Sequence, residues 1–562
     1  LWQIEELHKK GVNGMQVNYS HTKEEGYPTD KDDPKLFSEE WWDVWKFVSD
    51  ECGKRNMGIG LSGYTLDWPY SAAYGKATNL FSRIIYSITE INGRTIEVDT
   101  TLMAKAGDEI NLPVSSESIG VWAYPKVNGK ISKGGIDLQQ FVKNAKLSWT
   151  PQMGNWELYV FSTKRHPGTL NPIHPLAGKT VIDKFFQRFQ NNTVDQTSKG
   201  LNYFFQDELS FGVGDRIWSD DFNNKFKELK GYDVFEILPA LYTDMGQITA
   251  KARLDFMDVK IQLSEERYFK PIFDWHWSRG MIYGCDNHGR GLDPHAYGDY
   301  FRAARWYTAP GHDTPRGNAG LIKGKVSSSI ANLYKRPRVW LEGYHSLGWG
   351  ATPERLMFAT SENYLYGCNL LNLHGLYYTT HGSFWEWAPP SYHFRMPYWD
   401  HLTVFLKYFE RLSFLLSQGV MQSDIAIMYP VSPIQAKMIS RQEPGWNKPK
   451  GVLGVNYQEY TKAAFESGTE LFNNGYDFVF MDHQSLARAE INENQFAVSD
   501  ASYKVLVLPT MKSVRWSTLE QALKFYRNGG IVVAVESLPE ASDRIGNNDP
   551  KLDAAMKEIF GA

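Results

Sequence analysis

Short apolar segments that end directly in carboxylic acids constrain this chain more than any other feature. Residues 203–205 (YFF) read as a buried strand, and Asp207 and Glu208 follow it closely. Residues 338–341 (RVWL) form a second such segment, which leads directly into Glu342. Strands that present acids at their carboxyl ends are typical of α/β barrels. We therefore expect Glu208 and Glu342 to meet across one pocket.

The sequence around these segments alternates between helix and strand patterns. Residues 15–19 and 57–61 read as strands, and Ser38 caps the helix expected between them. Later strand patterns end at Asp286 and His374. Helix and strand at this spacing are typical of a parallel α/β fold. The predicted fold class is therefore α/β, with a (β/α)8 TIM-like barrel.

The pattern changes between residues 80 and 161. Segments there are short and alternate apolar with polar residues, and Asn128-Gly129 is typical of a hairpin turn. Such a stretch predicts a β-sandwich that is inserted into a surface loop of the barrel.

A further α/β unit follows residue 423. Four strands rich in Val, Ile, Phe and Leu are expected at 424–429, 477–481, 504–508 and 531–535. Strands with so few polar residues indicate a parallel sheet covered on both faces, as in a doubly wound domain. The unit lacks a GxGxxG or phosphate-loop motif, so we interpret it as structural. The predicted domains are the first part of the barrel (1–78), the inserted β-sandwich (79–165), the rest of the barrel (166–422) and a flavodoxin-like α/β domain (423–562).

Composition limits the partners of the chain. Its 60 basic and 64 acidic residues give a net charge of −4, which argues against a nucleic-acid surface. We expect no membrane partner, because no run approaches the ~18 apolar residues of a membrane helix. Three scattered cysteines suggest neither disulfides nor zinc. The chain opens inside an expected helix without an initiator Met, so we expect its natural start and signal region to lie outside this sequence. A periplasmic or extracellular bacterial protein is the corresponding expectation.

The paired acids suggest chemistry on sugars. Glycoside hydrolysis uses one carboxyl group to protonate the leaving oxygen and a second as nucleophile or as base for water. The proton donor needs a raised pKa and therefore a partly apolar site. Phe205 and Phe211 flank Glu208, and Trp340 precedes Glu342. The competing interpretation is that each glutamate is an ion-pair partner or a helix cap.

Asp207 is the alternative proton donor. Side chains alternate along a strand, so we expect Asp207 and Glu208 to point to opposite faces and only one to enter the cleft. We prefer Glu208 for its longer reach, and we assign Asp207 to a supporting role or to contact with a substrate hydroxyl.

Other polar and aromatic residues near predicted strand ends are candidate contacts for a carbohydrate substrate. A single histidine is more often a core or loop residue, and tryptophans near Pro389-Pro390 can equally well pack under the prolines. No HExxH motif or spaced histidine pair supports a metal site, so the sequence itself requires no cofactor. The candidate substrate-binding residues are Asp207, His276, Asp286, His345, Trp349, His374, His381 and Trp385.

Several segments, taken in chain order, resemble glycoside hydrolase family 106, the α-L-rhamnosidases. The resemblance spans nearly the whole chain. The segments are GVNGMQVNY, SEEWWDVWKFV, LSWTPQMGNWELYVFS, GKTVIDKFFQRFQ, FFQDELSFG, RVWLEGYHSLGWGATPERL, NLLNLHGLYY and SDIAIMYP.

This resemblance implies a (β/α)8 barrel and an inverting mechanism. It makes Glu208 the general acid and Glu342 the base that activates water. It also implies Ca²⁺ at the active site, as described for some members, with ligands that the resemblance does not identify. Many relatives carry a DSYE-like strand end where this chain has QDE, so contacts to sugar hydroxyls are expected to differ.

The leading functional hypothesis is an exo-acting α-L-rhamnosidase for a plant or algal polysaccharide or glycoside. One alternative is a barrel glycosidase for another sugar, such as a retaining β-galactosidase-like enzyme. The other is a carbohydrate-binding protein without catalysis. Carboxyl separation distinguishes inversion from retention, at roughly 6.5–9.5 Å against about 5–5.5 Å.

Overall fold

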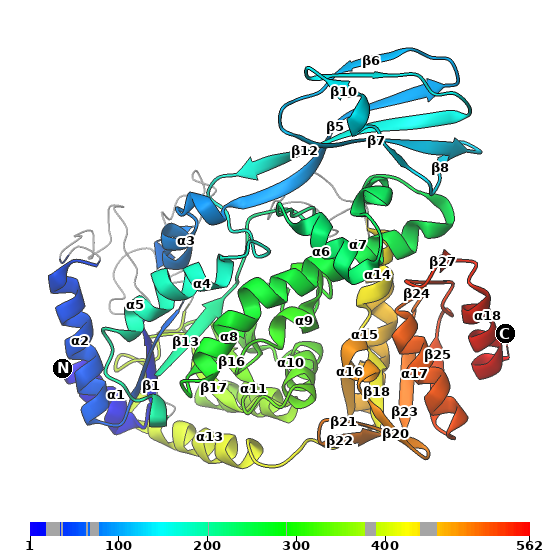
Figure 1. Ribbon diagram of the computed structural model, residues 1–562. Helices are drawn as coiled ribbons and strands as arrows, with labels where there is room; N and C mark the ends of the chain where they lie inside the picture. The colour runs from blue at the N-terminus through cyan, green and yellow to red at the C-terminus, as the bar shows by residue number, and fades with distance from the viewer. Residues whose placement is uncertain are drawn as a thin grey trace.

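The chain has an α/β fold with three regions, two with parallel sheets and one with antiparallel sheets. The computed structural model describes residues 1–17, 34, 37–62, 66–67, 78–199, 202–287, 289–376, 389–438 and 458–561. Figure 1 shows a helix-rich region with parallel strands, an antiparallel β region above it and a third region at the C-terminus. No helix in the described ranges combines the length and apolarity needed to cross a membrane.

Seven parallel strands in the described residues form two sheets that follow chain order. The first sheet has the order β1-β2-β13-β14 and the second β15-β16-β17. A parallel bridge between Gly284 and Ala309 joins the sheets, and the Asn372 amide donates to Gln16 Oε1 at 3.3 Å between β17 and β1. We call this part, residues 1–91 and 167–416, the seven-strand unit. The strands are β1 (Gly14–Val17), β2 (Gly58–Ser62), β13 (Asn202–Asp207), β14 (Ile282–Asp286), β15 (Gly311–Thr314), β16 (Trp340–Gly343) and β17 (Leu370–Leu373).

One face of these strands carries aromatic side chains in the middle of the strands and acidic side chains at their carboxyl ends. Phe205 stacks on Trp340 with ring centroids 4.7 Å apart, and a Cβ at Gly284 would lie 2.5 Å from the Trp340 ring. Asp207 pairs in register with Asp286 two residues further along β13 and β14. Because side chains alternate, the acids share a face with the aromatic pair and lie nearer the carboxyl ends.

Helices surround the parallel strands, and their caps follow the sequence. Ser38 Oγ accepts from the Trp41 N–H at the start of α2, and Thr352 caps α11, as a Thr-Pro start predicts. Most of α7 is buried on all sides, which explains its wide apolar face. The main helices are α1 (Trp2–Lys10), α2 (Glu39–Lys54), α6 (Phe222–Lys230), α7 (Thr249–Ser264), α8 (Lys270–Trp277), α9 (Tyr300–Ala304), α10 (Leu321–Leu333), α11 (Pro353–Leu365) and α13 (Leu402–Leu416).

Residues 93–166 form two antiparallel sheets, which we call the insert. One sheet has the order β5-β12-β7-β8 with β9 beside β7, and the other β10-β11-β6. Buried side chains from both sheets, among them Leu147 and Leu158, pack in one cluster. Asn128 and Gly129 both have left-handed φ and connect β7 to β8, as the predicted hairpin requires. The strands are β5 (Gly93–Lys105), β6 (Ile110–Pro113), β7 (Ser118–Val127), β8 (Lys130–Ile131), β9 (Ile136–Asp137), β10 (Val142–Lys143), β11 (Lys146–Trp149) and β12 (Asn155–His166).

The insert begins later than the expected residue 79. Residues 80–85 form helix α3 (Leu80–Ile85), and Phe81, Ile85 and Ile91 belong to the apolar cluster of the seven-strand unit. The sequence of this stretch is apolar at helical spacing, so it packs against helices. The first residue of the antiparallel region is Gly93.

The insert also shares an apolar cluster with the seven-strand unit. Trp122 of β7 stacks on Phe235 with centroids 5.8 Å apart, and Phe161 of β12 lies at the same distance from that ring. The Tyr124 hydroxyl donates to the Phe235 carbonyl at 2.5 Å. Aromatic contacts of this size anchor the insert firmly.

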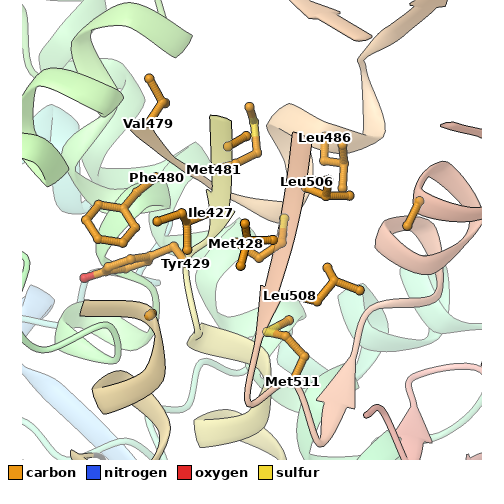
Figure 2. Packing of buried hydrophobic residues seen from close by; sticks show 14 of the residues in the cluster. Ile427, Met428, Tyr429, Val479, Phe480, Met481, Leu486, Leu506, Leu508 and Met511 are labelled. Carbon is orange, nitrogen blue, oxygen red and sulfur yellow. The ribbon is translucent and has the colours of Figure 1, made fainter. Parts of the chain in front are cut away.

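The C-terminal region has a parallel sheet with the order β19-β18-β23-β25, or 2-1-3-4 in chain order. Ile427 and Met428 of β18 are both buried although they point to opposite faces, so the sheet is covered on both sides. Figure 2 shows this packing, with Leu506 and Leu508 of β23 beside β18. We call residues 425–560 the C-terminal unit. Its main elements are β18 (Ile425–Met428), α14 (Val431–Lys437), α15 (Gln458–Asn473), β19 (Phe478–Met481), α16 (His483–Ala487), β23 (Val505–Pro509), α17 (Trp516–Arg527), β25 (Ile531–Val535) and α18 (Pro550–Phe560).

Candidate functional site

Three carboxyl groups meet at the carboxyl ends of the parallel strands. Asp207 ends β13, Asp286 ends β14 and Glu342 lies in β16. One oxygen from each lies within 4.8 Å of the other two. Parallel register places Asp207 beside Asp286, because equivalent positions on neighbouring strands face the same side. Glu342 comes from the second sheet, where its register partner on β15 is Asp313. We call these three residues the acidic triad.

Asp286 and Glu342 are buried and Asp207 is partly buried, and burial changes how these acids titrate. Burial, followed by the charges of Glu342 and Glu208, raises the pKa of Asp207 well above its usual range. Burial and the charge of Asp207 raise the pKa of Asp286, and burial with the charge of Asp286 raises that of Glu342. Three carboxylates this close repel one another, so the site favours either shared protons or a bound cation.

A fourth acid, Asp313, lies beside the triad in a different environment. Asp313 lies on β15 and pairs in register with Glu342 of β16. Its carboxylate forms ion pairs with Arg290 and with Lys323, whose Nζ lies 3.1 Å away. His345 Nε2 lies 3.3 Å from Asp313 Oδ2. Burial alone would raise the pKa of Asp313, but the His345 contact and the two cations hold it well below its usual range. Asp313 is therefore a charged anchor for the surrounding side chains.

Glu208 approaches the triad by leaving the strand conformation. Its φ is +40°, in the left-handed region, and its N–H donates to Asp286 Oδ1 at 3.2 Å. The Glu208 carboxylate forms an ion pair with Arg290, which lies 3.8 Å from Asp286. The expectation that only Asp207 or Glu208 enters the cleft is therefore wrong, because strict alternation ends where the backbone turns.

Of the two proposed catalytic glutamates, Glu208 is the more accessible. Glu208 is partly exposed, whereas Glu342 is buried. The charge of Glu208 contributes to the raised pKa of Glu342. The catalytic roles of the two glutamates remain a prediction. Altogether five carboxyl groups face two fixed cations, Arg290 and Lys323.

Among the predicted substrate contacts, the structure places His345 and His374 next to each other. Their ring centroids are 5.6 Å apart, and burial followed by the charge of His345 lowers the pKa of His374 to about 4. Trp349 is 39% exposed on the loop that follows β16. These three side chains follow strand ends, as expected. His381 and Trp385 lie outside the described residues.

His276 is a core residue, and its prediction as a substrate contact is wrong. It lies on α8, is fully buried, and has Nδ1 2.8 Å from the Ile272 carbonyl. Its ring stacks on Tyr283 at 4.2 Å, and burial lowers its pKa to about 3. Apolar packing in the helix layer explains its position.

Sequence reasoning missed Arg290, Asp313 and Lys323. Arg290 lies in the loop after β14, and Lys323 lies at the start of α10, which follows β15. The sequence DNHGRG, which begins with the last residue of β14, carried a signal, since a glycine-flanked arginine comes four residues after the acid that ends the strand. Asp313 had no apolar segment before it, so no strand pattern marked it.

Buried acids at the carboxyl ends of parallel strands define the type of site that glycoside hydrolases of α/β fold use. The chain belongs to glycoside hydrolase family 106, described as alpha-L-rhamnosidase, whose sequence model matches residues 128–452. It is therefore a glycoside hydrolase by family.

Two solved structures have a similar fold. A rhamnosidase from Novosphingobium sp. PP1Y aligns with a TM-score of 0.69 at 12% identity, over 100% of this chain and 69% of that one. Gan42B, a GH42 beta-galactosidase from G. stearothermophilus, aligns with a TM-score of 0.56 at 11% identity, over 99% of this chain and 72% of that one. Identities this low establish similarity of fold alone.

A curated relative is longer than this chain. The protein of Formosa agariphila named "Putative beta-glucuronidase" is 26% identical over 97% of this chain and 48% of its own length. The chain thus spans about half the length of that relative.

Proposed function

We propose that the chain is the catalytic part of an inverting exo-α-L-rhamnosidase that acts on a plant or algal polysaccharide or glycoside. The observation that carries the proposal is the convergence of Glu342 with Asp207 and Glu208 at the strand ends of a family 106 chain. A periplasmic or extracellular location and a carbohydrate partner belong to the same proposal.

The corresponding architecture is a (β/α)8 barrel with an inserted β-sandwich and a flavodoxin-like C-terminal domain. The seven parallel strands of the described residues, in chain order, support the barrel. The approach of β17 to β1 through Asn372 and Gln16 supports its closure.

In the proposed mechanism Glu208 is the general acid and Glu342 is the base. Inversion needs space for a water molecule between sugar and base, and thus carboxyl groups about 6.5–9.5 Å apart. Asp207 and Glu342 approach within 4.8 Å, too close for such a pair. An inverting reaction therefore favours Glu208 as the proton donor, with Asp207 in a supporting role. The raised pKa of Asp207 and the ion pair of Glu208 with Arg290 favour the alternative, Asp207.

The acidic triad fits the calcium ion that the family resemblance implies. Ca²⁺ binds carboxylate oxygens, and Asp207, Asp286 and Glu342 would hold it through one oxygen each, which leaves the second oxygen of Glu342 to act as the base. The ion would supply positive charge that offsets the repulsion among these acids. It would also offer a coordination site for a sugar hydroxyl.

Calcium is expected to stabilise EDTA-treated protein against heat. Binding to the folded state alone contributes about 2.7 kcal/mol at a concentration 100 times Kd, which raises Tm. Differential scanning fluorimetry with and without CaCl2 measures the shift. Asp286→Asn should remove it, whereas Asp274→Asn at an exposed position of α8 should keep it. An equal shift in Asp286→Asn would show that calcium binds elsewhere.

A panel of aryl glycosides tests the reaction. We expect hydrolysis of the α-L-rhamnoside, and ¹H NMR should show the β anomer of rhamnose first, as inversion requires. First appearance of the α anomer would indicate retention and exclude the proposed mechanism. Absence of turnover on every glycoside would support a binding protein instead.

The Formosa relative makes a glucuronidase the second candidate. The panel therefore includes β-D-glucuronide and β-D-galactoside. Faster turnover of the glucuronide than of the rhamnoside would replace the leading proposal.

A further inference from the structure

The loop that carries Arg290 has an unfavourable backbone. It connects β14 to α9, and five of its residues have left-handed φ values between 46° and 93°. For the non-glycine residues Arg290 and Tyr297 this conformation costs roughly 1–2 kcal/mol each. The loop needs contacts from elsewhere to hold this shape, which places the Arg290 guanidinium between Glu208 and Asp313.

Two buried side chains of the C-terminal unit supply such contacts. The Tyr429 hydroxyl donates to the Gly291 carbonyl at 2.7 Å. Gln435 Nε2, on α14, donates to the Gly298 carbonyl at 2.8 Å. The two bonds hold both sides of the loop, and one acceptor is the residue next to Arg290. Tyr429 and Gln435 are only 3% and 1% exposed, so water does not compete for these bonds.

The orientation of the Gln435 amide is fixed by Arg515. Arg515 Nη2 donates to Gln435 Oε1 at 2.9 Å, and its Nη1 donates to the Leu254 carbonyl at 3.2 Å. A guanidinium only donates hydrogen bonds, so the amide oxygen must face Arg515. The amide nitrogen then faces Gly298.

The glycines at the two acceptor positions allow close packing of the loop. Gly291 has φ +75°, and a Cβ there would lie 2.6 Å from Val326 of α10. Gly298 has φ +93°, and a Cβ there would lie 2.9 Å from Ile261 of α7. The loop thus fits against helices of the seven-strand unit while the C-terminal unit holds its carbonyls.

The ring of Tyr429 packs in the apolar core, and its hydroxyl makes the hydrogen bond to the loop. Its ring belongs to the apolar cluster and lies 4.7 Å from the Phe301 ring. Figure 2 shows the hydroxyl at the outer end of the ring, at the edge of the labelled cluster. Removal of the hydroxyl alone therefore leaves the packing in place.

We propose that Tyr429 and Gln435 are positioning residues for the reaction, which act by locking loop residues 289–299 so that Arg290 holds Glu208 at the acidic triad. The C-terminal unit thereby acquires a role in turnover without touching the substrate. This inference rests on the proposed function, because it assumes that Glu208 takes part in the reaction.

Tyr429→Phe is expected to lower kcat for the aryl rhamnoside about tenfold with KM within about twofold, since small displacements of a catalytic group cost rate. Gln435→Glu keeps the acceptor for Arg515 and loses the donor to Gly298, so it should act in the same direction. Tyr526→Phe, on an exposed position of α17, is the matched control and should match the wild type. Circular dichroism should show Tm values within a few degrees of the wild type.

A double-mutant cycle with Arg290→Gln distinguishes positioning from general destabilisation. If Tyr429 acts through Arg290, the double variant should be no slower than Arg290→Gln alone. Hydrogen exchange of peptides covering 289–298 should also increase in Tyr429→Phe and not in Tyr526→Phe.

Three outcomes would overturn the proposal, and they are distinguishable. Wild-type kcat in Tyr429→Phe and Gln435→Glu, with an active wild type, removes the positioning role alone. Multiplicative effects of Tyr429→Phe and Arg290→Gln show that Tyr429 acts by another route. An inactive wild type on the whole panel refutes the proposed function, and the positioning role with it.

Discussion

Replacing Glu342 by glutamine is expected to lower kcat for an aryl α-L-rhamnoside by about 10²- to 10⁴-fold, the usual contribution of a general base. The amide keeps the shape of the side chain but cannot accept a proton from water. Steady-state kinetics on purified variants measures the effect.

The fold of this variant is expected to survive. Burial raises the pKa of Glu342, so the folded state disfavours its ionised form and loses stability as pH rises towards neutrality. A neutral glutamine avoids this cost, so Tm at pH 7 should not fall. Glu354→Gln, on the exposed first turn of α11, is the matched control. Wild-type kcat in Glu342→Gln would exclude this residue as the base.

Glu208→Gln is expected to lower kcat by about 10²- to 10⁴-fold for substrates with poor leaving groups and less for 4-nitrophenyl glycosides. A general acid protonates the departing oxygen, and a leaving group that is stable as an anion needs little help. Comparing 4-nitrophenyl rhamnoside with a rhamnosyl disaccharide under identical conditions measures this difference.

Asp207→Asn decides between the two neighbouring acids. As a supporting residue, Asp207 should affect both substrates by similar factors, without dependence on the leaving group. If Asp207→Asn shows that dependence and Glu208→Gln does not, the proton donor is Asp207. The short distance from Asp207 to Glu342 would then favour a retaining reaction.

The positions of the main acids could be predicted because strands carry a local signal. Apolar residues before Asp286 and Glu342 mark buried strands, and the parallel order of β14, β15 and β16 brings their carboxyl ends to the same side. The hairpin at Asn128-Gly129 and the helix cap at Thr352 are equally local. Each of these features depends on neighbouring residues in the chain.

The features that sequence could not give depend on distant residues. The left-handed turn at Glu208 is held by Arg290, which is 82 positions away. Strand β15 (GHDT) is buried although its sequence is not apolar. Its His312 is accommodated in the interior by a hydrogen bond between Nε2 and Asn363 Oδ1 at 3.3 Å. His276 resembles a site residue in sequence and is packed on Tyr283 in the fold.

The aromatic contact of Trp122 and Phe161 with Phe235 bears on how the insert can move. A swing of the insert as a flap would first have to separate rings that are shielded from water, and burial of this kind is worth several kcal/mol. The orientation of the insert is therefore expected to be set when the chain folds and to stay fixed afterwards.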